Sequence, residues 1–306
     1  MSNAGLTSTG LTSADLTSAD LTSVIVVSAD SGPLLADCVE RVLASTSDVE
    51  LILVDNASTD GVPQRTIAAH AGDTRLRFVD NADNIGFGPA CNRGAKIANG
   101  DVLLFVNPDC LVVADSVAQL RSTLGQCAGV GIVGADVRDQ SGVPTPASRR
   151  RDPTLRRVVA TLTGAARLAS RWPALAGVAI PGERPTDPES VDAISGACFA
   201  IRRDTFDRLG GFDEGYFLHF EDIDLCRRVR DVGLRVLLDP GAPVRHFQGS
   251  SSQHRMVFVA RHKHAGMWRW FNRFDPAAKN PLLRGLVWLG IRAHLGWFRL
   301  REFFSR

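Results

Sequence analysis

The chain has 306 residues, of which 44% are hydrophobic and 22% are charged. This composition is typical of a globular protein and argues against a disordered one. The 35 Lys and Arg residues nearly balance the 33 Asp and Glu residues, so a net charge of +2 gives no global argument for nucleic-acid binding. The six cysteines lie far apart, without metal-binding or redox spacing, which predicts free thiols in a reducing compartment.

The N-terminal segment is repetitive, because Leu-Thr-Ser recurs every five positions from Leu6 to Leu21. This period fits neither helix nor strand and predicts a flexible low-complexity tail over residues 1–22. The segment lacks the basic and apolar stretches of a signal peptide, and no run of about 18 apolar residues occurs in the chain. We therefore expect a cytoplasmic protein, or one peripheral to the inner face of the cytoplasmic membrane.

Residues 23–252 begin with apolar runs that alternate with stretches of helical period. Continuous apolar runs are typical of strands buried on both faces, and strand–helix alternation predicts an α/β fold. We expect a Rossmann-like, mostly parallel sheet with helices on both faces. The expected strands are 24–27, 51–54, 76–79 and 102–106, and the expected helices are 34–44, 63–71 and 86–98.

The second half of the chain is less regular. Residues 140–190 contain seven prolines and a basic cluster that includes 149–151, which predicts a loop-rich insertion or lid. Strands 197–201 and 235–238 then flank a helix over 223–232, and a basic, aromatic-rich helical region is expected over 253–306.

Polar residues follow each of the first four expected strands. In a parallel sheet these points lie along one edge, where open α/β folds bind ligands. Asp and Asn also cap helices and start turns, so each cluster alone has a structural explanation. Together they favour a hard cation, Mg²⁺ or Mn²⁺, bridged to a diphosphate. The clusters are 28–30, 55–60, 80–84 and 107–109.

A set of motifs in a characteristic order makes the family recognisable. The motifs are Val54–Gly61, Asn84–Gly88, Cys91–Gly94, Asn107–Asp109, Ser195–Cys198, Gly210–Glu214 and Phe220–Arg228, followed by His246. Over residues 22–255 the chain resembles the family 2 glycosyltransferases with a GT-A fold, closest to the bacterial rhamnosyltransferase-like branch that builds cell-wall and surface polysaccharides.

The resemblance implies a role for each matching position. Asp55 would accept a hydrogen bond from the nucleotide base, and Asp109 and His246 would bind the cation on the diphosphate. The other implied substrate-binding residues are Ser28, Asp30, Asn56, Asn84, Gly86, Asn92, Arg93, Asn107 and Gly196. His246 could instead be a buried structural histidine.

Asp222 is the expected general base, and Glu221 would orient the acceptor or the base. Such a base contributes about 10²–10⁴-fold to the rate, and direct attack opposite the leaving diphosphate inverts the anomeric configuration. The alternative is that Asp222 only caps a helix. The predicted reaction transfers a sugar, rhamnose from dTDP-rhamnose or another dTDP- or UDP-sugar, to a hydroxyl of a glycan or polyprenyl-diphosphate-linked acceptor.

Two departures from the family pattern keep other functions open. Ala29 stands where many relatives have an aromatic residue that stacks on the base, and Asn107 replaces the first Asp of the metal motif. These give slight support to a degenerate nucleotide-sugar-binding relative without turnover, whereas the intact Asp109, Asp222 and His246 argue against it. A sugar-phosphate nucleotidyltransferase is a further alternative, although its Gly-rich basic loop is absent, and no nucleic-acid motif is present.

The C-terminal residues 281–306 predict a basic amphipathic helix. Arg284, Arg292, Arg299 and Arg306 fall on one face of a helical projection, while apolar residues cover most of the rest. Such a helix can lie on an anionic membrane surface. It could equally pack on its own domain or on a second subunit in a homodimer.

Overall fold

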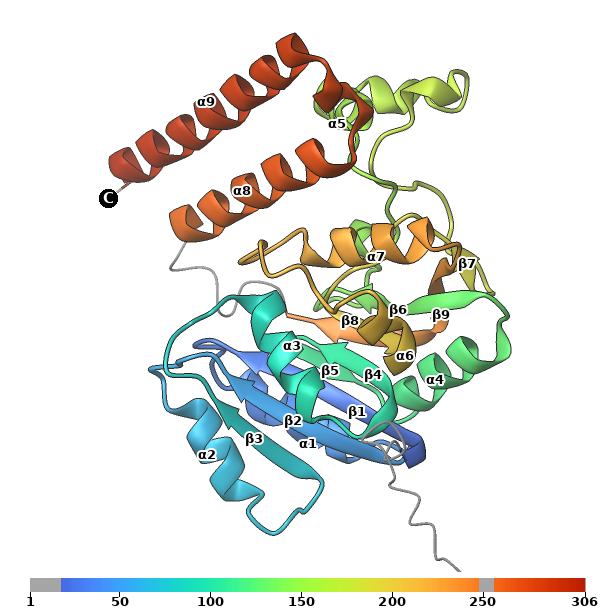
Figure 1. The fold of residues 1–306 in the computed structure, drawn as a ribbon, viewed down its shortest axis with the longest axis vertical. Coiled ribbons are helices and arrows are strands. Elements are labelled where there is room, and N and C mark those ends of the chain that lie inside the picture. The colour runs from blue at the N-terminus through green and yellow to red at the C-terminus, as the bar shows by residue number, and fades with distance from the viewer. Residues whose placement is uncertain (1–17, 248–255, 306) are drawn as a thin grey trace, which may run out of the picture.

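The computed structural model describes residues 18–247 and 256–305. One mixed sheet with helices on both faces fills one end of the long axis, and the last two long helices lie toward the other end (Figure 1). Within the described residues the strand order is β3-β2-β1-β4-β8-β6-β9-β5, and β7 pairs with β9. This α/β architecture confirms the predicted fold class.

The first half of the sheet is parallel, as the sequence predicts. β1 pairs with β2 and β4, and β2 pairs with β3, all in parallel. Each crossover contains one helix, since parallel neighbours need a long connection. The elements are β1 (Ser18–Ser28), α1 (Leu34–Leu43), β2 (Val49–Asp55), α2 (Val62–Ala69), β3 (Leu76–Asp80), α3 (Phe87–Ile97) and β4 (Gly100–Val106).

The second half of the sheet mixes strand directions. β8 runs antiparallel between β4 and β6, whereas β6 and β9 are parallel. β6 was not among the expected strands, because glycines interrupt its apolar run; an added Cβ at Gly134 would lie 2.5 Å from Ile194 Cβ. The elements are β5 (Cys110–Val112), α4 (Ser116–Gln126), β6 (Val130–Arg138), β7 (Glu189–Ser190), β8 (Cys198–Arg202), α6 (Arg203–Arg208), α7 (Glu221–Asp231) and β9 (Arg235–His246).

The hydrophobic core has two layers, one on each face of the sheet. Val24 and Val26 of β1 pack in one layer with buried side chains of α1 and α4. Ile25 and Val27 point into the other layer, which contains buried side chains of α3, α6 and α7. Alternate residues of one strand thus fill both layers, which explains the continuous apolar runs. All six cysteines are free, and five of them are buried.

The insertion between β6 and β7 is loop-rich but contains helical turns. These are η2 (Pro146–Ser148), α5 (Leu155–Leu162), η3 (Ala165–Leu168) and η4 (Pro173–Leu175). The N-terminus of α5 is capped from outside the insertion, since the Leu155 N–H donates to Asp275 Oδ2 at 2.5 Å. The insertion is therefore tied to the C-terminal region.

The C-terminal region consists of α8 (Met256–Phe274), η6 (Pro276–Lys279) and α9 (Pro281–Ser305). α8 buries Trp270 and Phe271 against the domain. No helix within the described ranges is both long and apolar enough to cross a membrane. The expected boundary at residue 252 lies outside the described residues.

The expected N-terminal tail ends earlier than the repeat pattern suggests. β1 begins at Ser18, and Thr22 is buried beside β2. Pairing with β2 and β4 thus extends the strand into the repeat. Residues 1–17 of the expected tail lie outside the described residues.

Candidate functional site

The ends of three parallel strands meet at one edge of the sheet. Ser28 at the end of β1 is in register with Asp55 at the end of β2, and Asp55 is in register with Asp80 at the end of β3. The Asn56 N–H donates to the Ser28 carbonyl at 2.7 Å, which continues the pairing beyond the strands. Strand register therefore places the first three polar clusters side by side.

Asp30 holds the turn after β2 in place. Its Oδ1 accepts hydrogen bonds from the Thr59 N–H at 2.6 Å, the Thr59 hydroxyl at 3.0 Å and the Asp60 N–H at 3.2 Å. Ser58 Oγ accepts from the Asp30 N–H at 3.0 Å and lies 3.4 Å from Ser28 Oγ. Asp30 has a φ of 55°, a conformation that Asp and Asn adopt more readily than most residues.

Asn56 is the centre of an amide network that connects the turns after β2 and β3. Its Nδ2 donates to Asn84 Oδ1 at 2.9 Å and to the Gly86 carbonyl at 3.1 Å, and its Oδ1 accepts from Asn81 at 3.1 Å. Arg93 of α3 then donates to Asn81 Oδ1 at 2.6 Å. The network brings the expected residues Asn56, Asn84, Gly86 and Arg93 together.

Asp55 is almost completely buried, and both of its carboxylate oxygens already have hydrogen-bond partners in the protein. The residue is only 1% exposed. One oxygen accepts from the Ser58 N–H at 3.0 Å, and the other accepts from Gln64 Nε2 at 2.9 Å. A carboxylate has further lone pairs, so a base could still bond to it if Gln64 moves. The base-binding role of Asp55 stays a prediction.

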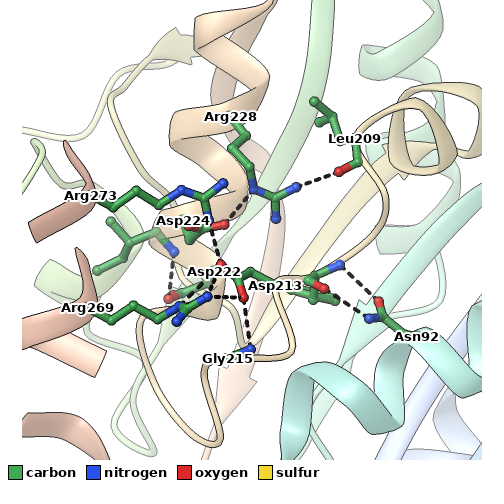
Figure 2. Close-up of polar contacts among 11 residues, drawn as sticks. Asn92, Leu209, Asp213, Gly215, Asp222, Asp224, Arg228, Arg269 and Arg273 are labelled. Carbon is green, nitrogen blue, oxygen red and sulfur yellow. Dashed lines mark hydrogen bonds and ion pairs between the residues drawn. The ribbon is translucent and has the colours of Figure 1, made fainter. Parts of the chain in front are cut away.

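Asn92 belongs to a different part of the molecule from the other amides. Its Nδ2 donates to the Phe212 carbonyl at 3.0 Å and to Glu214, while its Oδ1 accepts from the Phe212 N–H at 2.9 Å. These bonds hold the glycine-rich turn before α7 against α3, as Figure 2 shows. Asn92 therefore has structural partners within the protein, and its contact with the substrate stays a prediction.

Asp109 and His246 form the pair expected to bind a cation. His246 Nε2 lies 3.0 Å from Asp109 Oδ1 and 3.4 Å from Asn107 Nδ2, because β5 and β9 pair at this end of the sheet. Cis ligands of an octahedral cation with bonds of about 2.0–2.1 Å also lie about 3 Å apart, so the separation fits. Within the described residues no group of three His, Cys, Asp or Glu side chains could hold a metal. Among the described residues, the pair would therefore supply two ligands to a cation.

Asp222, the expected general base, is held by three hydrogen bonds. Its Oδ2 accepts from the Gly196 N–H at 3.0 Å and from Arg150 Nη2 at 2.8 Å, and its Oδ1 accepts from the Ile223 N–H at 2.8 Å. An added Cβ at Gly196 would lie 3.0 Å from Asp222 Cβ, so glycine allows the close approach. Arg150 also donates to the Ile194 carbonyl, which fixes the guanidinium.

The loop over residues 195–197 connects the expected base to the expected cation ligands. Gly196 donates to Asp222, and the carbonyl of the next residue, Ala197, accepts from the Asn107 N–H at 2.8 Å. Asn107 in turn lies beside His246. The fourth polar cluster and the Glu221-Asp222 motif, which are more than 100 residues apart in the sequence, therefore meet at the same edge.

Glu221 lies inside the protein, behind Asp222. It is 6% exposed, and its Oε2 is buried without a hydrogen-bond partner among the described residues. Burial, and then the charge of Asp222, raise the pKa of Glu221 to about 8. Glu221 packs close to α3, since a Cβ added at Gly88 would lie 3.7 Å from the Cβ of Glu221. Because Glu221 is buried there, an acceptor-orienting role would have to act through Asp222.

Ion pairs fix the first turn of α7, which carries these acidic residues, to its surroundings. Asp224 is fully buried and accepts from Arg228 Nε at 2.5 Å and from Arg273 Nη1 of α8 at 3.0 Å. Arg269 and Arg273 also bind Asp213 in the turn before α7 (Figure 2). The interior location of Asp224 is explained by α8, which packs over it and supplies Arg273.

The sequence did not identify Arg150 as a partner of Asp222 or Arg273 as a partner of Asp224. The sequence separations are 72 and 49 residues, and no local pattern links these positions. The basic cluster 149–151 was noticed, yet Arg149 pairs instead with Glu189. Only the folded chain distinguishes the arginine that reaches the site from its neighbour.

Comparisons with known proteins find similarity over most of the chain. The profile of the family described as glycosyltransferase like family 2 matches residues 19–267. The N-acetylglucosaminyl-diphospho-decaprenol L-rhamnosyltransferase of Mycobacterium tuberculosis is 29% identical over 301 residues, which cover 89% of this chain and 91% of the relative.

Solved structures support the fold. The mannosyltransferase PcManGT from Pyrobaculum calidifontis, in complex with GDP-Man and Mn²⁺, matches with a TM-score of 0.57 at 20% identity over 88% of this chain and 69% of that chain. GalNAc-T7 with UDP, GalNAc and Mn²⁺ matches with a TM-score of 0.56 at 18% identity over 80% of this chain and half of that chain. At these identities the likeness shows the GT-A fold alone.

Proposed function

The chain belongs to glycosyltransferase-like family 2, and from that premise we propose that it is an inverting glycosyltransferase that moves a sugar from a nucleotide diphosphate to an acceptor hydroxyl. The observation that carries the proposal is the hydrogen-bonded loop 195–197, which joins Asp222 to Asn107 beside the Asp109–His246 pair. A base and a diphosphate-binding pair at one edge are what such a transfer requires.

The donor binds across the ends of β1, β2 and β3. Ser28, Asp30 and the amide network around Asn56 surround the place where an open α/β sheet holds a nucleotide. The relative from M. tuberculosis is a rhamnosyltransferase by name. We therefore take dTDP-rhamnose as the donor to test first, with a UDP-sugar as the alternative.

Asp222 accepts the proton of the attacking hydroxyl. Arg150 and the Gly196 N–H both bond to its Oδ2, so the carboxylate is fixed before the acceptor arrives. The hydroxyl oxygen forms a bond to the anomeric carbon as the bond to the diphosphate oxygen breaks. Attack from the face opposite the leaving group inverts the anomeric configuration.

Asp109 and His246 would hold a divalent cation, Mg²⁺ or Mn²⁺, for the diphosphate of the donor. When bound, the cation neutralises negative charge as the nucleoside diphosphate leaves. Asn107 lies beside this pair and can hydrogen-bond a phosphate or ribose oxygen, although it replaces the carboxylate that many relatives have. Two protein ligands from the described part of the chain fit an ion that is also bound by substrate oxygens.

The acceptor is a polyprenyl-diphosphate-linked sugar in cell-wall or surface polysaccharide synthesis, on the cytoplasmic side of the membrane. This follows the relative, whose name specifies N-acetylglucosaminyl-diphospho-decaprenol. The relative is aligned over 91% of its own length, so the two chains correspond almost end to end.

The experiment incubates the chain with Mn²⁺ or Mg²⁺, a nucleotide sugar and a water-soluble, short-chain polyprenyl-diphosphate GlcNAc. We expect rhamnose transfer from dTDP-β-L-rhamnose, with an α-linked product seen by NMR. Asp222→Asn should lower kcat by about 10²–10⁴-fold. A retained configuration in the product would contradict the inverting mechanism.

Thermal stability in the presence of nucleotides separates an enzyme from a degenerate relative. A ligand that binds the folded state raises the apparent stability, so dTDP with Mn²⁺ should shift the melting temperature of both wild type and Asp222→Asn. A nucleotide shift without turnover for any sugar donor would favour the degenerate relative. No shift with any nucleotide would contradict the donor site itself.

A further inference from the structure

We propose that the protein docks on an anionic lipid bilayer through two separate segments, residues 155–175 and helix α9, which together we call the lipid face. The purpose that we assign to this contact, binding of a lipid-linked acceptor, rests on the proposed function. The evidence for the contact itself is independent of that function. The sequence predicted a membrane contact for the C-terminal helix alone. The structure adds the insertion as a second contact.

Exposed apolar side chains are concentrated on the lipid face. Of the fifteen large apolar side chains exposed among the described residues, ten belong to it. Single exposed apolar residues are normal, but a concentration of this kind marks an interaction surface. The ten are Val159, Leu162, Leu168, Trp172, Leu282, Leu286, Trp288, Leu289, Trp297 and Leu300.

Helix α9 is apolar on most of its surface and packs on the protein along one side only, where His294 contacts His264 of α8. It is 25 residues long, and none of its described side chains is buried. Leu282 is 71% exposed and Trp297 is 54% exposed. A helix that is apolar around most of its circumference normally lies in a core or against lipid.

The charge of the lipid face matches an anionic surface. Its sequence contains eight of the 35 Lys and Arg residues of the chain and only one of the 33 Asp and Glu residues, Glu302. Arg157 pairs with Asp192, whereas Arg156, Arg171 and Arg292 form no ion pair with any other described residue. Arginine beside exposed Trp and Leu is the composition of helices that lie on anionic membranes.

The two segments of the lipid face are joined to each other. Asp275, in the linker before α9, caps the first turn of α5. A cleft of about 610 Å³ lies between them, lined by Leu155 and Val159 of α5, by the linker and by Leu283 of α9. Figure 1 places α5 and α9 at the same end of the molecule, away from the sheet. The two segments of the lipid face therefore adjoin at the linker before α9.

The insertion also connects the lipid face to the catalytic edge. Arg150, which holds Asp222, precedes Leu155 by five residues, and five residues span at most about 18 Å. A lipid-linked acceptor whose chain stays in the bilayer could thus present its sugar near Asp222. The lipid face would serve to collect the acceptor.

A second copy of the chain is a poorer occupant than a bilayer. A two-fold dimer places the same patch of both subunits in contact. Both segments are rich in arginine and nearly free of acidic residues, so two lipid faces would repel each other. A bilayer of anionic phospholipid supplies negatively charged headgroups for the arginines and an acyl-chain region for the apolar side chains.

The experiment is flotation of the full chain with vesicles of 30% phosphatidylglycerol and 70% phosphatidylcholine, compared with pure phosphatidylcholine. We expect flotation with the anionic vesicles, and at least ten-fold weaker binding to neutral vesicles or in 0.5 M NaCl. Leu162→Glu/Trp172→Glu and Leu286→Glu/Leu289→Glu should each weaken binding at least ten-fold. The control is Val113→Glu/Val143→Glu, which alters two apolar residues outside the lipid face that are 46% and 57% exposed. This control should float like wild type.

The insertion variant decides the proposal. If Leu162→Glu/Trp172→Glu floats like wild type, the two-segment face is wrong. If wild type fails to float and light scattering shows a dimer that Leu286→Glu/Leu289→Glu dissociates, the face is a subunit interface instead. Unchanged melting temperatures show that the variants are folded, which is expected because the altered side chains are exposed.

Transfer assays separate this proposal from the proposed function. The lipid-face variants should keep wild-type kcat on the short-chain, water-soluble acceptor and lose at least ten-fold in rate on a long-chain acceptor embedded in vesicles. A wild type that floats but transfers sugar to neither acceptor would overturn the proposed function alone. Equal rates of variants and wild type on the embedded acceptor, together with equal flotation, would overturn the lipid face alone.

Discussion

The donor half and the acceptor half of the candidate site are assembled in different ways. The donor half lies where β1, β2 and β3 end, and its bonds join short turns through amide, hydroxyl and carboxylate groups. The acceptor half places Glu221, Asp222 and Asp224 on one helical turn. Two of these carboxylates are paired with arginines that arrive from remote segments.

The difference shows that the acceptor half, more than the donor half, depends on ion pairs to offset the free-energy cost of buried carboxylates. The carboxylates of the donor half accept hydrogen bonds from neutral donors, and the loss of one such bond has a modest cost. A buried carboxylate is stable only while its partners stay in place, because a lone buried charge is costly. We therefore expect changes in the acceptor half to have larger effects than changes of similar size in the donor half.

The largest effect is expected on global stability, from Arg228→Ala. This change removes a charged partner of the fully buried Asp224 and a donor to the Leu209 carbonyl (Figure 2). Breaking a buried pair typically costs about 3–5 kcal/mol, which urea denaturation would measure. Arg75→Ala is the control for an exposed ion pair, since Arg75 lies before the start of β3, away from the candidate site, and its pair with Asp73 should cost at most about 1 kcal/mol. Equal losses of unfolding free energy in Arg228→Ala and Arg75→Ala would show that burial of the ion pair does not set its contribution to stability.

The pH dependence of stability tests whether Glu221 is buried in its neutral form. Its pKa is raised from 4.5 to about 8, first by burial and second by Asp222. Between these values the unfolded chain has released the proton that the folded chain retains, so stability falls as pH rises by up to about 1.4 kcal/mol per unit. The contribution is fully present below pH 4.5.

Glu221→Gln removes this titration and keeps the shape of the side chain. We expect the free energy of unfolding of wild type, relative to the variant, to decline steadily from pH 4.5 to 8. Urea denaturation across this range measures the difference. A constant difference would show that Glu221 has an ordinary pKa and that the acceptor half carries less electrostatic cost than the structure implies.

The same contrast explains what the sequence could predict. Strand ends such as Asp55 and Asn107 were placed correctly because parallel pairing aligns the ends of strands, whatever lies between them. Most expected strands and helices also lie within a few residues of the observed ones. Glycine-interrupted β6 was missed, because its pattern is not a continuous apolar run.

The sequence could not predict which remote side chain neutralises a given carboxylate. Arg149 and Arg150 are adjacent and chemically identical, yet one binds Glu189 and the other binds Asp222. Burial was equally hard to predict, since Asp224 is covered by a helix that begins more than 30 residues later. Such pairings depend on tertiary packing, on which no local pattern reports.

This adjacency offers a matched test of catalysis. Arg150→Ala should lower kcat on the order of 10²-fold, because a misplaced base loses the aligned geometry, while leaving the dTDP-induced melting shift unchanged. Arg149→Ala removes a similar ion pair from the same segment and should leave kcat within about two-fold of wild type. Partial recovery by Arg150→Lys would indicate that charge contributes as well as shape. Similar losses for Arg149→Ala and Arg150→Ala would show that only the fold of the insertion matters.

The smallest effect is expected in the donor half, from Asp30. Its Oδ1 accepts three hydrogen bonds from Thr59 and Asp60, so Asp30→Ala should loosen the turn and weaken dTDP binding about ten-fold, or about 1.4 kcal/mol. The positive φ adds strain for alanine, whereas asparagine tolerates this conformation and keeps an accepting oxygen. Asp30→Asn should therefore bind dTDP nearly as wild type does, and both variants should reach wild-type kcat at saturating donor. A fall in kcat for Asp30→Asn would mean that the charge of Asp30 acts on the reaction itself, and the donor half would then share the electrostatic character of the acceptor half.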